Sequence, residues 1–410
     1  MSLIVHQHLR ISIVFSFIYG IAMLFNSYNA IAAEWSITPT VIFGGEYDDN
    51  FRLTTTGDDG ITGTSITPEV NFNRADPNSA VSIGARLKYT QYDNEEIPGT
   101  SVQYLTLSSR YKTQRSQWRL NGFLKSDTTL TTIADSSVPG DDETSPQDVD
   151  AGLVEVSVRR NQLSLDPSWR YALSKLTSLQ LGYGLNDVSY SNAGGTGLVD
   201  HRSHRVNTGI NHQLDENNTM GIKAQFSRFR TPDTDSKTDN ISLTASLDHK
   251  FLQDLKGNVS LGYRETTTTS ATDEDKSDGV VLKAGIIKQQ TQITSYNISL
   301  KRDIRSSGVG REIQSDELNM RLNHRITPRL SMFFSASAFD NKTLEGDVTS
   351  IDRVYYSAEP GVRWSMTRDW AIDGSYVYRR QKRDLETVTA ESNAIYLSIS
   401  YSWPKIAASR

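Results

Sequence analysis

Apolar and polar residues alternate strictly in the stretch from Ser392 to Trp403. Ile395, Leu397 and Ile399 share one face of an extended chain, and Tyr396, Ser398 and Ser400 share the other. Successive side chains of a β-strand point to opposite faces, so the stretch predicts a strand with one apolar and one small polar face. In a soluble sandwich the apolar face would pack on a second sheet. In an outer-membrane barrel it would contact lipid, and the polar face would meet a water-filled lumen.

The same alternation recurs along the whole chain and favours the barrel. Similar segments lie at 81–90, 118–125, 179–186, 241–247 and 354–364. Many are longer than the roughly 9–11 residues that cross a bilayer, so some strands are expected to project beyond it. Helical periodicity is almost absent, and no apolar run after the N-terminal region approaches the roughly 20 residues of a membrane-spanning helix.

One predicted strand breaks this alternation. Val154, Val156 and Val158 share one parity, whereas Leu163 and Leu165 share the other. A one-residue bulge within 159–162 would reconcile the two halves, and a separate turn there is the alternative.

Short polar turns alternate with longer loops rich in Asp, Gly, Ser and Thr, as in up-and-down outer-membrane barrels with periplasmic turns and extracellular loops. The short turns lie at 75–79, 114–117, 174–177, 215–218, 253–256, 289–292, 327–329 and 367–369. The long loops lie at 51–59, 94–100, 129–149, 192–200, 231–237, 268–278, 305–311, 342–350 and 384–387. This order predicts an all-β, antiparallel transmembrane barrel of about 18 strands, with 16 as the alternative, and with both termini in the periplasm.

The N-terminal residues 1–32 have the features of a secretory signal peptide. Arg10 supplies positive charge, 11–25 is apolar, and Ala30-Ile31-Ala32 fits a cleavage site. An N-terminal membrane anchor is the alternative. The expected domains are therefore a signal peptide at 1–32 and an outer-membrane β-barrel at 33–410.

Composition agrees with export. The chain has 410 residues, no cysteine, and a formal charge of -5. A cysteine-free chain is compatible with an oxidising compartment in which no disulfides are needed.

Assigning the polar phase of each strand to the lumen makes the lumen basic. Eleven basic residues are predicted to line the pore: Arg86, Lys88, Arg110, Arg119, Lys125, Arg264, Lys283, Lys301, Arg321, Arg363 and Arg379. Arg159 and Lys223 fall on the same phase. The acidic residues of this phase are fewer, namely Glu46, Glu69, Glu155, Glu359 and Asp373. Negative charge gathers instead in the loops, at 58–59, 95–96, 141–143 and 273–275.

A basic channel with low-dielectric walls concentrates anions, and the planar guanidinium group matches carboxylates and phosphates. The interior therefore predicts a conduit for an acidic solute. The alternative is that the lumen charges pair with each other and with loop acids, which would give a rigid, unselective interior. The acidic loops are interpreted either as solvated tips or as sites for divalent cations beside lipopolysaccharide.

Several function classes lack their motifs. The chain has no Walker loop, no H-E-x-x-H, no G-x-S-x-G and no metal-spaced His or Cys cluster, so no catalytic residue, cofactor or metal is expected. Asp200-His201 lies at a loop end, but a catalytic base needs a nucleophile or water beside it. Nucleic-acid binding is not expected, because the exterior is apolar and the loops are acidic. No N-terminal plug domain is expected, although the 129–149 loop could fold inward.

Three segments carry a resemblance to known proteins. They are I-T-P-T at 37–40, E-Y-D-D-N at 46–50 and I-T-P-E-V at 66–70. With the hairpin pattern, they resemble Gram-negative outer-membrane β-barrel proteins found with exopolysaccharide biosynthesis and export systems. The resemblance implies a role in surface-polysaccharide export or assembly, and it carries over no catalytic residues. The chain departs from such barrels by continuing past Trp403 to Arg410, whereas many of them end on the aromatic residue of the last strand.

The sequence thus predicts an outer-membrane pore for an anionic solute such as an acidic exopolysaccharide. The alternative is a structural or adhesive barrel with a blocked lumen, whose acidic loops bind surface glycans or lipopolysaccharide. An outer-membrane hydrolase is a third hypothesis. The expected partners are outer-membrane lipid, lipopolysaccharide, the barrel-assembly machinery, acidic polysaccharide and periplasmic export proteins.

Overall fold

A computed structural model describes most of the chain. The described residues are 34–56, 60–94, 97, 99–130, 157–191, 193–232, 236–270, 274–289, 293–344, 352–384 and 388–409. The predicted signal peptide at 1–32, Val154, Glu155, Val156 and nearly all of the 129–149 loop lie outside these residues. Within them, no helix is long and apolar enough to span a membrane.

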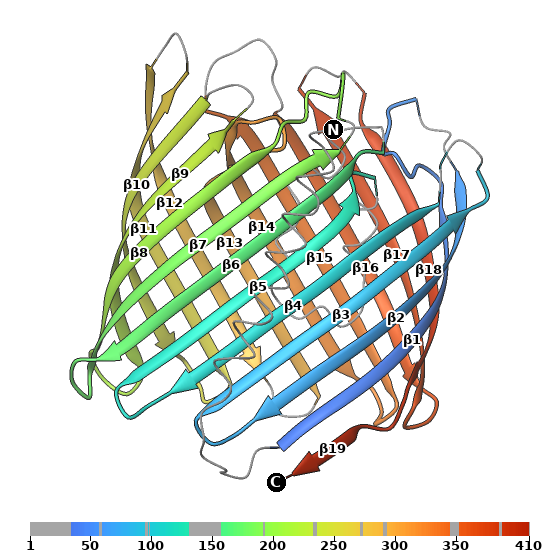
Figure 1. Cartoon of the computed structure of the whole chain (residues 1–410), viewed down its shortest axis with the longest axis horizontal. Helices are drawn as coiled ribbons and strands as arrows, with labels where there is room; N and C mark the ends of the chain where they lie inside the picture. Colours follow the sequence, from blue (N-terminus) through green and yellow to red (C-terminus); the bar gives the residue numbers. More distant parts are fainter. Residues whose placement is uncertain are drawn as a thin grey trace, which may run out of the picture.

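The regular elements of this part of the chain are antiparallel β-strands (Figure 1). They are β1 (Glu34–Asp48), β2 (Ile61–Ala75), β3 (Ser79–Tyr92), β4 (Thr100–Lys112), β5 (Ser116–Thr128), β6 (Arg159–Ala172), β7 (Thr177–Ser191), β8 (His201–Gln213), β9 (Asn218–Thr231), β10 (Ser236–Lys250), β11 (Leu255–Thr269), β12 (Glu274–Gln289), β13 (Thr294–Ser306), β14 (Glu312–Arg325), β15 (Leu330–Thr343), β16 (Arg353–Ser365), β17 (Trp370–Arg383), β18 (Ala390–Ser402) and β19 (Ile406–Ser409).

The barrel closes where β1 meets β18. Strands β1 to β18 each pair with their neighbours in the chain, and β1 also pairs with β18, from Thr40 opposite Ser402 to Asp48 opposite Ala394. Closure leaves neither of these two strands as an open edge. The predicted up-and-down barrel of 18 strands is confirmed, and the tail beyond Trp403 forms β19, which pairs with Glu34–Ile37.

The two ends of the barrel differ, and we call them the short-turn end and the long-loop end. The short turns and the C-terminus lie at the bottom of Figure 1, and the longer connections lie at the top. Strands enter several segments predicted to be loops. For example, Glu274 and Asp275 belong to β12. Polar residues can belong to strands here because the barrel wall extends beyond its apolar outer surface.

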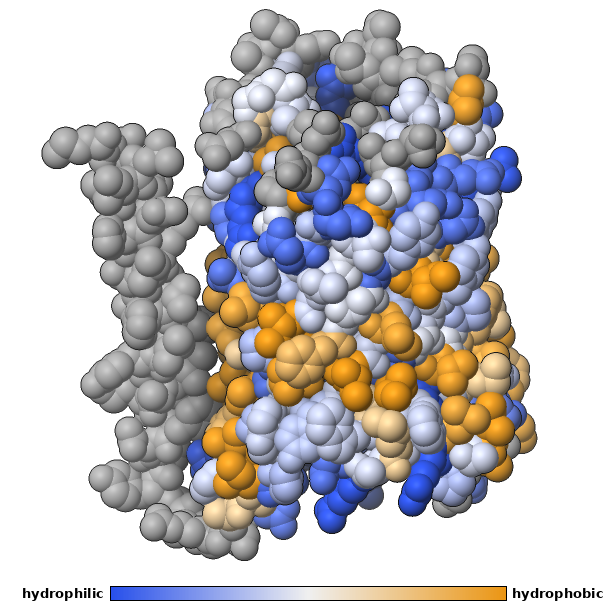
Figure 2. Space-filling model, turned by 90° about the vertical axis from the view of Figure 1, so that its right-hand side faces the viewer, coloured by the Kyte–Doolittle hydropathy of each residue, from blue (hydrophilic) through white to orange (hydrophobic). Residues whose placement is uncertain are grey.

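The outer face of the barrel carries an apolar belt. Ile241 and Leu397, for example, leave 63% and 60% of their surfaces exposed outside the barrel. Figure 2 shows hydrophobic side chains gathered around the lower part of the molecule, with hydrophilic side chains above them. An exposed belt of this kind is what a membrane-spanning barrel presents to lipid.

All six tryptophans of the chain belong to the outer face at the short-turn end. They are Trp35, Trp118, Trp169, Trp364, Trp370 and Trp403. Tyr47 lies 12 residues beyond Trp35 on the same face of β1. At about 3.3 Å per residue and a tilt of about 40°, the two rings lie about 30 Å apart along the barrel axis. This separation matches the apolar band and aromatic girdles of an outer-membrane barrel.

Ion pairs occupy the outer face above this belt, towards the long-loop end. Arg202 pairs with Asp187, and Arg302 pairs with Asp316. All four side chains belong to the outward phase of their strands, so the wall here suits water or lipid head groups rather than acyl chains.

Six of the short turns share a hydrogen bond from a backbone N–H group to a side-chain oxygen at the start of the turn. The Asp76 Oδ1 atom accepts hydrogen bonds from the backbone N–H groups of Asn78 (2.9 Å) and Ser79 (2.7 Å). Side-chain oxygens of Thr113, Ser174, Asp215, Thr327 and Thr367 accept backbone N–H bonds in the same way. Such local bonds favour tight turns, which explains why Asp, Ser and Thr mark these positions.

The bulge predicted within 159–162 is not present. Strand β6 begins at Arg159, and its pairing with β5 runs from Arg159 opposite Thr128 to Tyr171 opposite Ser116 without interruption. Arg159 therefore shares the outward phase of Leu163, and its assignment to the lumen was wrong. Its guanidinium binds Ser126 and the Ser101 carbonyl on the outer wall, and Arg160 faces inward instead.

Candidate functional site

The eleven basic residues predicted from the sequence share the inner, polar face of the barrel wall. Cross-strand pairing shows this directly, because paired residues point the same way. Glu69, Arg86, Tyr104 and Lys125 form one continuous row across four strands. The face opposite this row carries the exposed apolar belt. That these residues line a conducting pore stays a prediction.

Many inner cations have an acidic partner. The pairs include Lys88–Glu46 (3.8 Å), Lys125–Asp127 (3.0 Å), Lys283–Asp303 (3.2 Å), Lys301–Asp303 (3.8 Å), Arg363–Asp373 (3.5 Å) and Arg379–Asp48 (2.9 Å). These contacts agree with the interpretation in which lumen charges pair with each other. The interior is thus less basic than the sequence pattern suggested.

Sequence reasoning missed three of these acids. Asp127 and Asp303 lie two residues beyond Lys125 and Lys301 on the same strands, β5 and β13. Alternate residues of a strand face the same side, so extending each inward series by one more alternate residue would have found both acids. Asp48 ends β1 and was read only as part of the E-Y-D-D-N segment.

Three predicted cations have no carboxylate partner within 4 Å in the described part of the chain. The Arg110 and Arg119 side chains lie directly opposite each other on β4 and β5, at the short-turn end. Arg264 is 2% exposed on β11, and its Nε donates to the Thr266 hydroxyl (3.1 Å).

The connection from 49 to 56 folds against the inner face at the long-loop end. Leu53 is 1% exposed and clusters with Phe339, Tyr355 and Ala390, which are inward residues of β15, β16 and β18. Its φ of 54° lies in the left-handed region that side chains other than glycine rarely adopt. Packing in the cluster offsets this local strain.

The same connection packs on the neighbouring wall through Phe51. Phe51 clusters with Ile61 and with Tyr92, whose ring centroid lies 5.2 Å away. Asn50 fixes the backbone, since its side-chain amide donates to the Thr54 carbonyl (2.8 Å) and to the Glu391 carbonyl (2.8 Å). This connection is thus an inward-folded segment of the described structure, whereas the 129–149 loop lies almost wholly outside the described residues.

Two other connections meet over the far wall. The backbone N–H of Val199, before β8, donates to the carbonyl of Gly308, before β14 (2.8 Å). Beneath them, the Asn240 amide donates to the Glu312 carboxylate (2.6 Å). His201, considered as a base, is 4% exposed beside the ring of Phe229 (5.4 Å), so it packs at this end of the wall.

Accessibility of the inner face therefore falls from one end to the other. Arg110 and Arg119 are exposed at the short-turn end. Arg379 and Ser315, nearer the long-loop end, are both 0% exposed. Among the described residues, the inner face is thus accessible at the short-turn end, and side chains and connections bury it at the long-loop end.

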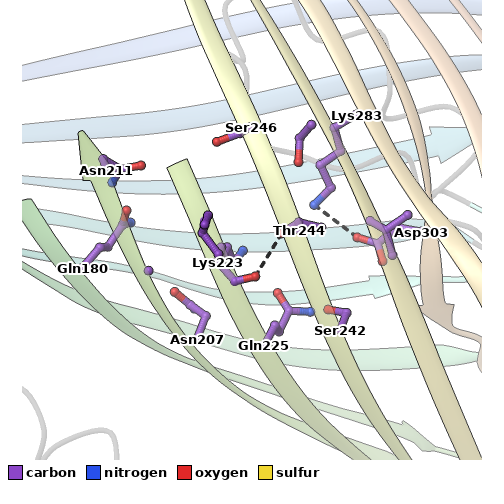
Figure 3. A pocket seen from close by; sticks show the side chains of 14 residues that line it. Gln180, Asn207, Asn211, Lys223, Gln225, Ser242, Thr244, Ser246, Lys283 and Asp303 are labelled. Carbon is purple, nitrogen blue, oxygen red and sulfur yellow. Dashed lines mark hydrogen bonds and ion pairs between the residues drawn. The ribbon is translucent and has the colours of Figure 1, made fainter. Parts of the chain in front are cut away.

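Midway along the wall lies a polar cavity of about 220 Å³, lined from β7 to β13 (Figure 3). Amide side chains and Lys223 line it from β7 to β9, and hydroxyl side chains together with Lys283 and Asp303 line it from β10 to β13. Glycines create the space. A Cβ at Gly221 would lie 2.6 Å from the Asn211 Oδ1 atom, so any larger residue would displace that side chain from its place on the wall.

Comparison with known proteins adds a family and several barrels of similar shape. A comparison with curated proteins found no match. Among solved structures, the chain is similar to OccK2 (OpdF) of Pseudomonas aeruginosa in complex with glucuronate, at 11% identity and a TM-score of 0.46, covering 90% of this chain and 98% of that one. It is also similar to OccAB2 of Acinetobacter baumannii, at 9% identity and a TM-score of 0.45, covering 90% and 98%.

A third similar structure is the apoprotein of the FrpB iron transporter (F5-1 variant) from Neisseria meningitidis, at 8% identity and a TM-score of 0.46, covering 90% of this chain and 81% of that one. The family model described as "Putative beta-barrel porin 2" matches residues 31–402, which is nearly the whole chain. The closed strand order and apolar outer belt agree with that match and with an outer-membrane location. This chain therefore belongs to the beta-barrel porin 2 family.

Proposed function

We propose that this barrel is a channel for an anionic, hydroxyl-rich solute, such as an acidic exopolysaccharide. One observation carries the proposal: the facing arginines at the accessible end. Arg110 and Arg119 lie directly opposite each other on the inner face. Like charges directly opposite each other repel, so this pair by itself does not stabilise the fold.

An anion passing along the inner face would relieve this repulsion. The Nε and Nη2 atoms of Arg119 lie 3.0 Å from the side-chain amide of Gln117, which leaves the guanidinium charge uncompensated. Arg170 extends the basic surface to β6, where its Nε donates to the Ser178 hydroxyl (3.0 Å). Guanidinium groups at a channel entrance raise the local anion concentration and bind carboxylates through paired hydrogen bonds.

The proposed direction of transport depends on which end of the barrel faces the periplasm. With the short turns and both ends of the barrel in the periplasm, the basic entrance would face the periplasm. An exported polyanion would meet these arginines before it reached the filled long-loop end. The resemblance to exopolysaccharide-associated barrels supports this direction, and the long loops would then lie outside the cell.

Reversal potential under a salt gradient tests the proposal, using the refolded full-length chain in a planar bilayer. Wild-type protein should show anion selectivity, and the double variant Arg110→Ser with Arg119→Ser should lose much of it. The matched control is Arg202→Ser with Arg302→Ser, which removes the same charge from the outer wall. Equal selectivity in wild-type protein and the inner double variant would refute the role of these arginines.

A second function is favoured by the connection at 49–56. Because Phe51 and Leu53 are buried on the inner face, the barrel could be a closed structural or adhesive element whose acidic loops bind glycans or lipopolysaccharide. Absence of conductance in both wild-type protein and a variant with this connection loosened would favour this second function. Conductance in either protein would favour the channel.

A further inference from the structure

We infer that the cavity between β7 and β13 is a binding subsite for one hydroxylated carboxylate unit, such as a uronic acid residue, with Lys223 holding the carboxylate. The inference rests on the proposed passage of an anionic solute and adds to it a defined site and ligand class. A cavity of about 220 Å³ is below the usual range for drug-sized ligands and suits a single small polar unit.

The lining matches hydroxyl groups. Four amide side chains line it, namely those of Gln180, Asn207, Asn211 and Gln225. Four hydroxyl side chains line it as well, namely those of Ser242, Thr244, Ser246 and Ser260. Each of these groups can both donate and accept, as can each hydroxyl of a sugar. No aromatic ring lines the cavity, so it offers nothing for a flat apolar ligand to stack on.

Lys223 supplies charge that its neighbours do not cancel. Lys283 pairs with Asp303 on the neighbouring strand at 3.2 Å, shown as a dashed line in Figure 3. Among the residues the structure describes, Lys223 has no carboxylate within 4 Å, and its side chain is one of those that line the cavity. The lining thus carries two lysines and one aspartate, and this positive balance among neutral donors and acceptors favours a carboxylate accompanied by hydroxyl groups.

Glycines hold this lining back from the cavity. Gly209 lies directly opposite Lys223 on β8 and adds no side chain beside its stem. A Cβ at Gly182 would lie 2.7 Å from the Asn207 Nδ2 atom. At Gly221 it would lie 2.6 Å from both Asn211 Oδ1 and Ser246 Oγ. The backbone therefore makes the space, and the long polar side chains lie along its walls.

Isothermal titration calorimetry of the refolded full-length chain in detergent tests the inference without relying on conduction. The probes are galacturonate, its neutral counterpart galactose, and acetate as a bare carboxylate. Wild-type protein should bind galacturonate saturably at about millimolar affinity, and more tightly than either control probe. Lys223→Gln should weaken galacturonate at least tenfold, because a hydrogen bond to a charged group is lost.

Two further variants make the result specific. Lys256→Gln removes an equal charge from the inner face of β11 outside the cavity and should leave affinity unchanged. Gly221→Ala keeps every charge but displaces Asn211 and Ser246, and it should weaken galacturonate binding severalfold.

Equal affinity for galacturonate and acetate, or equal losses in Lys223→Gln and Lys256→Gln, would overturn the inference. So would the absence of saturable binding to folded wild-type protein. Anion selectivity without saturable galacturonate binding would refute this subsite and leave the proposed function standing. Saturable galacturonate binding without anion selectivity would refute the proposed channel function and leave the subsite standing.

Discussion

The network that fastens β1 to β17 and β18 should fail when its carboxylate loses its charge. Asp48 Oδ2 accepts from Arg379 Nη1 (2.9 Å), and Oδ1 accepts from the Ser392 hydroxyl (2.7 Å) and the Asn50 backbone N–H (3.0 Å). Arg379 Nη2 also donates to the Tyr396 hydroxyl (2.6 Å). These bonds cross the closure of the barrel, so the perturbation of interest is Asp48→Asn.

Burial sets the size of the effect. The side chains of Arg379 and Asp48 are 1% and 3% exposed. Asn keeps the shape of Asp but leaves a buried guanidinium without its counter-charge, which typically costs about 3–5 kcal/mol of unfolding free energy. Replacing both members, as Asp48→Leu with Arg379→Met, leaves no unpaired charge and should recover most of that loss.

The chain supplies a matched control on β17 and β18. Arg380 and Glu391 form an ion pair at 3.6 Å on the outer wall, with both side chains 50% exposed. Water solvates and salt screens this pair, so Glu391→Gln should cost less than about 1 kcal/mol.

Equilibrium unfolding in denaturant, after refolding into lipid vesicles and monitored by tryptophan fluorescence, measures these differences. Asp48→Asn should lower the unfolding free energy several times more than Glu391→Gln does. A loss no larger than that of Glu391→Gln would refute the reasoning. The reasoning would also be refuted if the double variant lost about twice as much unfolding free energy as Asp48→Asn does.

Other outcomes follow from separate features. Replacing Phe51 and Leu53 together by Ser should loosen the inward-folded connection and raise single-channel conductance, whereas unchanged conductance would show that this connection does not limit flow. The hydrogen bond from the Ser79 hydroxyl lowers the pKa of Asp76 below its ordinary value of 3.8. The stability it supplies is therefore present above about pH 4 and lost as the pH falls through the folded-state pKa. Asp76→Ala should destabilise the protein at pH 7 but not below that pKa, as denaturation midpoints at both pH values would show. Fluorescence of Trp118 should be quenched by lipids brominated near the head group more strongly than by lipids brominated near the chain end, and the reverse order would contradict the interfacial placement of the tryptophans.

Alternation and turn spacing were enough to predict the barrel and its strand number, because a strand buried in lipid on one face must repeat with period two. The same parity placed Arg86, Lys125 and Arg379 on the inner face. The prediction was wrong at Arg159, because the alternation of Val154, Val156 and Val158 was extended to this residue, and those valines are not part of β6. A one-residue error reverses every side chain that follows.

The state of the interior was beyond sequence reasoning for a different physical reason. Ion pairs such as Arg379–Asp48 join residues 331 positions apart, and no local pattern brings them together. The inward packing of Leu53 likewise depends on Phe339 and Tyr355 from the opposite end of the chain. The cavity beside Lys223 depends on glycines of several strands meeting at one level of the wall.

Closure between β1 and β18 also sets the order in which this molecule can fold. A hairpin contact such as Ser108–Asn121 spans 13 positions, whereas Thr40–Ser402 spans 362. Loop-closure entropy makes the longer contact about 3 kcal/mol costlier to form. Until Ala390–Ser402 has arrived, β1 and the latest completed strand are both open edges able to pair with other chains. The species most exposed to aggregation is thus a nearly complete, still open sheet, and any factor that assists folding has most to gain by holding those two edges apart from other chains and bringing them together.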